Sequence, residues 1–247
     1  MTTSSEKIAF ISGANRGIGF ETAKGLGALG ITVVIGARNI TKGETAAKQL
    51  QALGFKAEAI HYDANQAQSA DNVFEHLNKH YGKLDILVNN AGINLEQLMG
   101  SDNSSTVSLD TIQQTFHSNL FAVIELTQKL LPLVKKAPAG RIVNLSSILA
   151  SLTLHSMPNS PIDPAKAFAY NASKTALNVY TVHLAHELKG TNIKVNSAHP
   201  GWVKTELGGD NATMEVADSY KTSVQLATLD SNGANGGFFH LGESLPW

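Results

Sequence analysis

Residues 12–19 read Ser-Gly-Ala-Asn-Arg-Gly-Ile-Gly and stand between an apolar run, 8–11, and a helix-like stretch, 17–29. The apolar run is typical of a buried strand, so the glycines are expected in a strand-to-helix turn. Glycine lets the backbone turn tightly and approach a pyrophosphate, and a helix N-terminus directs its amides at phosphates. A glycine triplet alone also fits ordinary helix packing, but its place after the first strand favours a dinucleotide site. The turn residues expected to bind such a cofactor are Gly13, Asn15, Arg16, Gly17, Ile18 and Gly19.

Strand-like and helix-like segments alternate along the rest of the chain. The strands are apolar and β-branched without polar alternation, which predicts a parallel sheet buried on both faces. No break in composition marks a boundary, so we expect one α/β domain over residues 1–247, a Rossmann-type doubly wound sheet with helices on both faces. Three prolines predict an irregular segment at 157–164, and 208–213 is expected to be a mobile loop. Further strands are predicted at 31–35, 56–61, 84–88, 141–145, 193–198 and, as the last, 237–241, and helices at 39–53, within 64–81, and at 110–133 and 168–188.

Composition excludes several classes of function. Hydrophobic residues make up 43% of the 247 residues, which suits a globular core. The net charge of −1 gives no electrostatic reason to expect nucleic acid or an anionic membrane as a partner. No cysteine is present, and the nine histidines show no spacing typical of metal ligands, so no metal is expected. No apolar run reaches the roughly 20 residues of a membrane helix, and the start is polar, so we expect a cytoplasmic protein.

Tyr170 and Lys174 are four positions apart in a predicted helix, so they share one face. Free tyrosine has a pKa near ~10, and a neighbouring ammonium lowers the pKa by stabilising the phenolate. Such a tyrosine can exchange a proton with a substrate oxygen while hydride moves to or from carbon. A half-buried tyrosine beside a surface lysine is the plainer interpretation of the same pair.

Two further polar features precede this pair. Ser146 and Ser147 follow the strand predicted at 141–145, where a hydroxyl could hold a substrate oxygen or simply end the strand. Asn119 interrupts an otherwise apolar helical stretch, and a buried asparagine needs partners. It could bind a water that links Lys174 to solvent, or satisfy neighbouring backbone.

Polar residues also follow the third and fourth strands. Asp63 could cap the next helix, or its carboxylate could meet an adenine ring. The tandem Asn89 and Asn90, followed by Ala91 and Gly92, end the fourth strand, where ligand crevices lie in folds of this kind.

The second strand predicts NADPH rather than NADH. An NAD site places an acidic residue at the end of this strand, where the chain has Ala37 followed by Arg38. A guanidinium binds a 2′-phosphate through charge-assisted hydrogen bonds, and Arg16 supplies a second cation on the same side. The alternative is that Arg38 points into solvent and Arg16 only caps carbonyls.

Taken in order, these pieces resemble the short-chain dehydrogenase/reductase family across essentially the whole chain. The resemblance implies a catalytic set of Asn119, Ser147, Tyr170 and Lys174, with Ser147 as the second serine of the pair. It implies that Tyr170 and Lys174 also contact the cofactor and that the segment after the sixth strand, which begins His-Pro-Gly, holds the carboxamide. The remaining cofactor residues are Arg38, Asn39, Asp63, Ala64, Asn90, Ala91, Gly92, Pro200, Gly201, Trp202, Val203 and Thr205.

Within that family the chain resembles the carbonyl-reductase branch, on residues 37–43 and on the ending at 236–247. Ser147 and Tyr170 are 23 positions apart, whereas compact members have about a dozen. The extra residues, within 149–169, are expected to wall the pocket and to cover a dimer face, which favours a monomer.

The leading hypothesis is an NADPH-dependent carbonyl reductase or alcohol dehydrogenase acting on a small molecule. The alternatives are a non-catalytic dinucleotide-binding regulator and a carrier-dependent ketoreductase. Candidate pocket residues are His155, Ile93, Trp202 and Leu207, and His199 is expected to be structural.

Overall fold

The computed structural model describes residues 6–97 and 103–247, so the polar start of the chain and residues 98–102 lie outside the described part. The described strands form one sheet in the order β3-β2-β1-β4-β5-β6-β7-β8. All neighbours are parallel up to β7, and β8 pairs with β7 in the antiparallel sense. The strands are β1 (Ile8–Ser12), β2 (Thr32–Ala37), β3 (Ala57–His61), β4 (Ile86–Asn89), β5 (Arg141–Leu145), β6 (Lys194–Ala198), β7 (Phe238–His240) and β8 (Glu243–Ser244).

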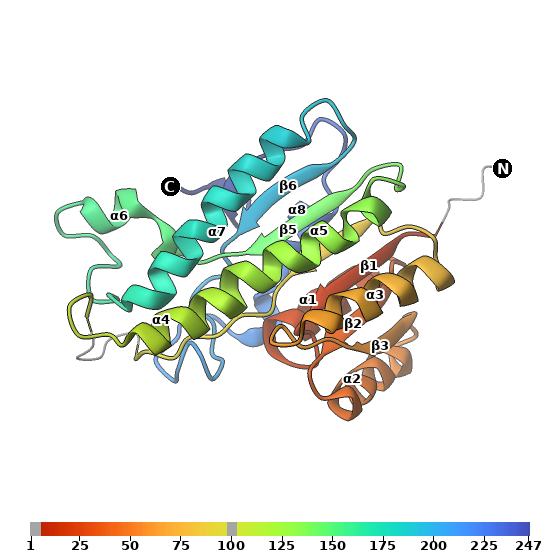
Figure 1. Cartoon of the computed structure of the whole chain (residues 1–247), viewed down its shortest axis with the longest axis horizontal. Helices are drawn as coiled ribbons and strands as arrows, with labels where there is room; N and C mark the ends of the chain where they lie inside the picture. Colours follow the sequence, from red (N-terminus) through yellow and green to blue (C-terminus); the bar gives the residue numbers. More distant parts are fainter. Residues whose placement is uncertain (1–5, 98–102) are drawn as a thin grey trace.

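Helices cover both faces of this sheet (Figure 1). The layer formed by α3, α4, α5 and α7 packs on one face, and α1, α2 and α8 pack on the other. The helices are α1 (Gly17–Ala28), α2 (Ile40–Ala52), α3 (Ala67–His80), α4 (Leu109–Phe116), α5 (Ala122–Val134), α6 (Leu152–Ser156), α7 (Phe168–Glu187) and α8 (Lys221–Ala227), with a π-helical turn at His117–Phe121 and 3-10 turns at Ile148–Ala150 and Val216–Asp218.

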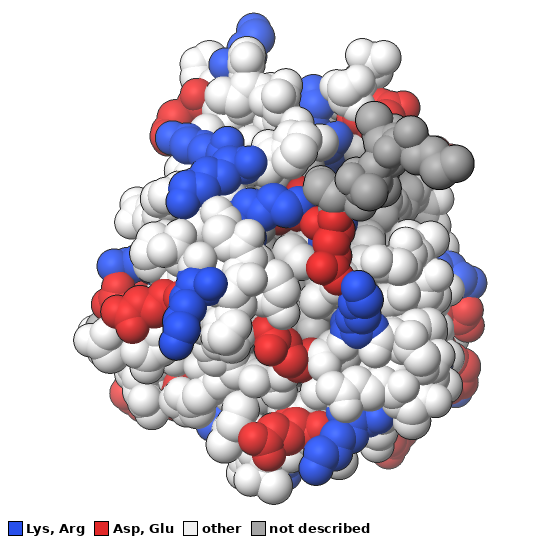
Figure 2. Space-filling model, turned by 90° about the vertical axis from the view of Figure 1, so that its right-hand side faces the viewer, with Lys and Arg blue, Asp and Glu red and all other residues white. Residues whose placement is uncertain are grey.

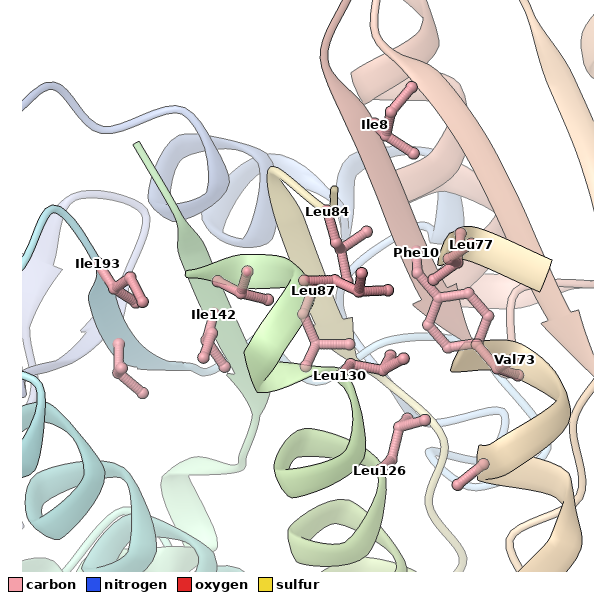
Figure 3. Close-up of a cluster of buried hydrophobic side chains, with 14 of the residues drawn as sticks. Ile8, Phe10, Val73, Leu77, Leu84, Leu87, Leu126, Leu130, Ile142 and Ile193 are labelled. Carbon is pink, nitrogen blue, oxygen red and sulfur yellow. The ribbon is translucent and has the colours of Figure 1, made fainter. Parts of the chain in front are cut away.

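Two apolar clusters hold the layers together. Every residue of β1, β2, β4 and β5 is buried, which confirms the burial predicted from the absence of polar alternation in these strands. On the first face Phe10 packs edge-on against Tyr62 and meets Leu126 and Leu130 of α5 (Figure 3). Each such side chain contributes about 1.5–3 kcal/mol when fully buried. The doubly wound α/β architecture predicted from the sequence is therefore confirmed.

Three details differ from the predicted elements. The strand near 237–241 is not the last, because the chain turns at Leu241 and Gly242, both at positive φ, and returns as β8. The helical stretch predicted at 110–133 is continuous but contains the π-helical turn, which places Asn119 in a locally widened helix. The insertion is irregular at 157–167, as predicted, but begins with the short helix α6.

The strand order reverses between β1 and β4. Chain segments leave these two neighbouring strands toward opposite sides, so a crevice forms at their carboxyl ends. Both the glycine-rich turn and the segment that starts with Asn90 lie at this point. The fold thus brings together the two stretches that were singled out as ligand-binding.

The charged surface carries no single sign on the face shown in Figure 2, where Lys and Arg lie among Asp and Glu. Among the described helices, none is both long and apolar enough to span a bilayer.

Candidate active site

A cleft of about 760 Å³ lies at the reversal of strand order. Its size falls within the range of about 300–1,000 Å³ that small-molecule sites occupy. The predicted cofactor residues on its wall are Gly13, Asn15, Arg16, Arg38, Ala64, Asn90, Ala91 and Gly92.

The glycine-rich turn closes tightly against the segment after β4. Gly13 has φ +67°, and a Cβ there would lie 3.1 Å from the Cα of Ala91. A Cβ on Gly19 would lie 2.5 Å from the Asn90 amide nitrogen. Helix α1 then begins after Arg16 with no side-chain cap, so its first-turn amides have no side-chain acceptor. These are the donors that an anionic pyrophosphate needs.

Asn90 and Ser12 hold the turn in place. The Asn90 side-chain amide donates to the carbonyls of Ser12 and Gly13 at 2.8 and 3.1 Å. The Ser12 hydroxyl accepts from the backbone N–H groups of Asn90 and Ala91, both at 3.0 Å. Asn89 points the other way, into the core, where it donates to Thr127 and Asn144 (2.9 and 2.8 Å). Only the second asparagine of the pair therefore serves the cleft.

The two arginines of the predicted phosphate site have different surroundings. Arg38 lines the cleft after β2. Arg16 instead donates from both terminal nitrogens to the Glu206 carboxylate at 2.6 Å, in an exposed ion pair. The alternative that Arg16 caps carbonyls is not what the structure shows. Asn39 caps α2 by accepting from the N–H of Lys42 at 3.0 Å.

Asp63 does not cap helix α3, so that interpretation is wrong. Its carboxylate accepts from the N–H of Asn65 at 3.0 Å and from the side chain of Gln66 at 3.2 Å. It thereby closes a turn before the helix, whose N-cap residue, Gln66, makes no side-chain cap. The contact with an adenine ring stays a prediction.

Tyr170 and Lys174 share the buried face of α7, as their spacing predicts. Lys174 Nζ donates to the carbonyl of Leu145 at 2.8 Å and lies 5.9 Å from the centroid of the Tyr170 ring. Ser147 lies close enough to Tyr170 for its hydroxyl to lower the pKa of the phenol, whereas the buried hydroxyl of Ser146 has no partner among the described residues. This geometry supports Ser147 as the functional serine.

The electrostatics of this pair differ from the prediction. Burial raises the pKa of Tyr170 to about 12, and the hydrogen bond with Ser147 lowers the pKa without reversing that shift. Burial also lowers the pKa of Lys174 to about 8. The expectation that the ammonium would bring the tyrosine pKa below its usual value is wrong for the chain by itself, because burial raises the pKa above that value. Tyr170 is therefore a neutral phenol, able to donate a proton.

Asn119 lies in the π-helical turn and is fully buried. Its Oδ1 accepts from the N–H of Ile93 at 2.8 Å, and its Nδ2 donates to the carbonyl of Ile93 at 2.9 Å and to Ser173 Oγ at 3.0 Å. Of the two alternatives, satisfying neighbouring backbone is confirmed. A Cβ on Gly92 would lie 3.1 Å from Asn119 Oδ1 and 3.3 Å from Lys174 Nζ, so both groups border the same glycine.

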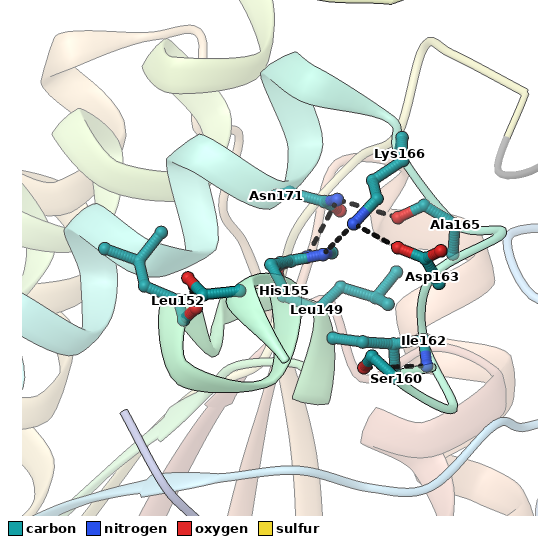
Figure 4. Close-up of polar contacts among 10 residues, drawn as sticks. Leu149, Leu152, His155, Ser160, Ile162, Asp163, Ala165, Lys166 and Asn171 are labelled. Atoms are coloured by element: carbon teal, nitrogen blue, oxygen red, sulfur yellow. Dashed lines mark hydrogen bonds and ion pairs between the residues drawn. The ribbon is translucent and has the colours of Figure 1, made fainter. Parts of the chain in front are cut away.

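The insertion packs against the first turns of α7 through polar side chains (Figure 4). His155 Nε2 donates to the carbonyl of Leu149 at 3.0 Å, and Lys166 Nζ donates to His155 Nδ1 at 3.1 Å. The Asn171 amide donates to the carbonyl of Ala165 at 2.9 Å and lies 3.3 Å from His155 Nε2. Burial lowers the pKa of His155, which suits the neutral ring that accepts from Lys166. A substrate contact by His155 stays a prediction.

The segment after β6 reaches the glycine-rich turn. Thr205 Cγ2 would lie 3.8 Å from a Cβ on Gly17. Earlier in the segment, Gly201 has φ +101°, and Val203 forms a β-bridge with Met214. The Trp202 indole donates to the carbonyl of Gly208 at 2.8 Å. Contacts of Pro200 to Val203 and Thr205 with a carboxamide stay predictions.

His199 is structural in its contacts, as predicted. Its Nδ1 accepts from the N–H of Ile148 at 3.2 Å, and burial, with the neighbouring His240, lowers its pKa to about 3. It therefore stays neutral and supports the turn after Ser147.

Several residues that border the site carried no sequence signal. Glu96 accepts from the N–H of Tyr170 at 2.9 Å across 74 positions, which no local pattern predicts. In the sequence Ser12 is simply the last residue of a predicted strand, and nothing there indicates its hydrogen bonds with Asn90 and Ala91. Residues of α4 and the π-helical turn also line the cleft. The only sequence pattern that indicates this is their spacing of three and four positions, which places them on one face of a helix. These wall residues are Asp110, Gln113, Gln114, His117, Ser118 and Phe121.

Known proteins resemble this chain in sequence and in fold. A family model described as short chain dehydrogenase matches residues 7–216. Carbonyl reductase (NADPH) 1 of Mus musculus is 30% identical over 286 aligned residues, covering 99% of this chain and 100% of that protein. An NADPH-bound carbonyl reductase from chicken fatty liver has a TM-score of 0.83 at 25% identity, with 98% and 99% of the chains covered. A short chain dehydrogenase from Burkholderia cenocepacia J2315 in complex with NADP has a TM-score of 0.78 at 29% identity, covering 94% of each chain.

The chain therefore belongs to the short chain dehydrogenase family, whose members are oxidoreductases. Within that family it lies in the carbonyl-reductase-like branch, which confirms the resemblance found in residues 37–43 and in the C-terminal ending.

Proposed function

We propose that this protein is an NADP(H)-dependent carbonyl reductase, or alcohol dehydrogenase in the reverse direction, in which Tyr170 is the proton donor. The observation that carries the proposal is a buried Tyr170 that lies beside Lys174 on one face of α7 and next to Ser147 at the carboxyl end of β5. The carbonyl reductases among its relatives support the same reaction class. The substrate is a ketone or aldehyde, or the matching alcohol.

The residues of the cleft fit a dinucleotide cofactor. The uncapped first turn of α1 offers amides to a pyrophosphate. Because Ala91 leaves no room for a side chain at Gly13, no side chain at this position covers the backbone of the turn. Arg38 lines the cleft without a neighbouring carboxylate at the end of β2, which suits a 2′-phosphate. The cofactor is NADP(H), in line with the NADPH-bound and NADP-bound relatives.

When bound, the cofactor supplies a hydride to the carbonyl carbon. Ser147 holds the substrate oxygen, and Tyr170 donates its phenolic proton to that oxygen as negative charge develops there. With a pKa of about 12, the phenol of Tyr170 carries its proton at neutral pH and is available as the donor for reduction. Lys174, with a pKa near 8 and anchored on the carbonyl of Leu145, is placed to return a proton to the phenolate.

The insertion walls the substrate side of the cleft and sets which carbonyl compounds enter. It buries Tyr170 together with Leu149, Ile162 and Ala165 in a small apolar cluster. An apolar wall beside the proton donor excludes water and suits an apolar carbonyl substrate. The covered face at the start of α7 also keeps a monomer as our expectation for the assembly.

The test is a screen of aldehydes, ketones, quinones and cyclic terpenoid or steroid ketones with NADPH and NADH, followed at the absorbance band of the reduced nicotinamide. We expect turnover of at least one carbonyl class, with a higher kcat/KM for NADPH. Tight NADPH binding without turnover of any class would instead identify a dinucleotide-binding regulator on the same fold.

A further inference from the structure

Glu96 is a buried carboxylate that the proposed reaction does not use. It lies in the segment after β4, and 8% of its surface is exposed. Its Oε2 accepts a hydrogen bond from the backbone N–H of Tyr170 at 2.9 Å. Its Oε1 is also buried and has no hydrogen-bond partner among the residues that the structure describes. A buried acidic side chain, next in sequence to the cleft-lining Leu95, thus contacts the backbone of the proposed proton donor.

Helix α7 has no cap of its own at the turn that carries Tyr170. Its N-cap residue, Ala167, makes no side-chain hydrogen bond, and its first turn contains no acidic residue. Tyr170 is the third residue of the helix, where a backbone N–H has no acceptor within the helix. Glu96 supplies that acceptor from a distant segment and adds negative charge at the positive end of the helix dipole.

The carbonyl of Tyr170 is held from the same segment by a second route. Asn119 binds both backbone groups of Ile93, three positions before Glu96, and donates to Ser173 Oγ. Ser173 Oγ in turn donates to the carbonyl of Tyr170 at 2.7 Å. The backbone of Tyr170 is therefore clamped at its N–H by Glu96 and at its C=O through Ser173.

Stability alone does not account for this arrangement. Burying a carboxylate with one unpaired oxygen costs free energy, even when the other oxygen is hydrogen-bonded. A Ser, Thr or Asp at position 167 would cap α7 locally without that cost. A polar group that is held at such a cost fits a role in fixing the geometry of a functional site.

We propose that Glu96 is a positioning residue for Tyr170, and that it ties the phenol to the segment that lines the cofactor cleft. The proposal rests on the proposed function, in which Tyr170 donates the proton. A misplacement of about 1 Å in a reacting group can lower the rate by about 10²-fold. Glu96 therefore acts on kcat through the position of the phenol and leaves cofactor affinity unchanged.

The experiment compares Glu96→Ala and Glu96→Gln with Glu75→Ala, a matched change of an exposed glutamate on α3. For each variant, kcat and the KM values for NADPH and the carbonyl are measured, together with hydrogen exchange of the Tyr170 amide. We expect Glu96→Ala to lower kcat by about 10- to 100-fold and to leave the KM for NADPH within about two-fold. Glu96→Gln keeps an acceptor for the amide and restores kcat to within about three-fold of the unmodified protein.

Amide exchange separates this proposal from the proposed function. Fast exchange of the Tyr170 amide in Glu96→Ala, with protection kept in Glu96→Gln and Glu75→Ala, supports the contact whether or not a substrate has been found. A kcat equal to that of Glu75→Ala, or a lower kcat with an unchanged Tyr170 amide, overturns the role of Glu96. Activity retained in Tyr170→Phe would overturn the proposed function instead.

Discussion

Two regions near the proposed proton donor are built in different ways: the lining of the cleft, and the insertion, which we propose as the wall of the substrate site. The wall formed by residues 12–19 and 90–92 is held by backbone geometry, with positive φ at Gly13 and hydrogen bonds from Asn90 to two carbonyls. The wall formed by the insertion is held by side chains, through the contacts of His155 with Leu149 and Lys166. The close approaches at Gly13 and Gly19 leave no room for a side chain in the first wall, whereas the contacts of the second can be made by other polar pairs. We infer that the first wall fixes the cofactor and the second sets the substrate.

The largest expected effect is at Tyr170, the proposed proton donor, which packs against the insertion. Tyr170→Phe removes the phenolic proton while keeping the ring in its apolar surroundings. Loss of one acid–base group lowers the rate by about 10²–10⁴-fold, so we expect kcat to fall within that range. NADPH affinity, measured by fluorescence titration, stays within about two-fold. More than a tenth of the original turnover in the Phe variant would show that another group donates the proton.

The backbone wall can be tested by comparing two glycines at similar positive φ. Gly13→Ala meets both the strain of φ +67° and the Cα of Ala91 at 3.1 Å, whereas a Cβ on Gly30, at φ +77°, meets nothing within 4 Å. An L-residue in this region costs about 1–2 kcal/mol, which both variants share. We expect Gly13→Ala to lose at least ten-fold in NADPH affinity and Gly30→Ala to keep it, with both followed by urea unfolding and cofactor titration. Equal NADPH affinities in the two variants would show that the close approach to Ala91 is not the reason for glycine at position 13.

This contrast also explains how far the sequence alone could lead. Gly13, Asn90, Tyr170 and Lys174 were predictable because their roles follow from local geometry: a turn, a strand end and two residues on one helical face. The contact of Glu96 with Tyr170 was not, because it joins residues 74 positions apart and depends on how the sheet brings two segments together.

The same distinction applies to charge and to the insertion. Arg16 could be placed in its turn, but its partner Glu206 lies 190 positions away. The raised pKa of Tyr170 follows from burial, which the spacing of Tyr and Lys does not report. The contacts within the insertion are among side chains whose partners no periodic pattern specifies.

Cofactor preference gives the next effect in size and distinguishes Arg16, in the first wall, from Arg38, which lines the cleft after β2. Arg38→Ala is expected to lower kcat/KM for NADPH by about ten-fold or more and to leave NADH unchanged, because hydrogen bonds to charged groups contribute roughly 1.5–3 kcal/mol. Arg16→Ala is expected to have at most a few-fold effect, since Arg16 already pairs with Glu206 and that pair is exposed. Steady-state kinetics with both cofactors would measure these ratios. An unchanged preference in Arg38→Ala would contradict this interpretation of the end of β2.

The smallest expected effect lies in the wall built from side chains. Lys166→Ala removes the donor to His155 Nδ1 and the 3.0 Å ion pair with Asp163. Because Lys166 and Asp163 are both largely exposed, the free energy of unfolding should change by less than about 1 kcal/mol. The His155 ring loses one of its restraints, so we expect a two- to five-fold change in the KM for a bulky ketone, with unchanged kcat and unchanged KM for NADPH. Lys129→Ala, which breaks a partly exposed ion pair between α5 and Asp71 of α3, is the matched control and should leave all three constants unchanged. If Lys166→Ala altered NADPH binding as much as ketone binding, the division of the cleft into a cofactor wall and a substrate wall would be wrong.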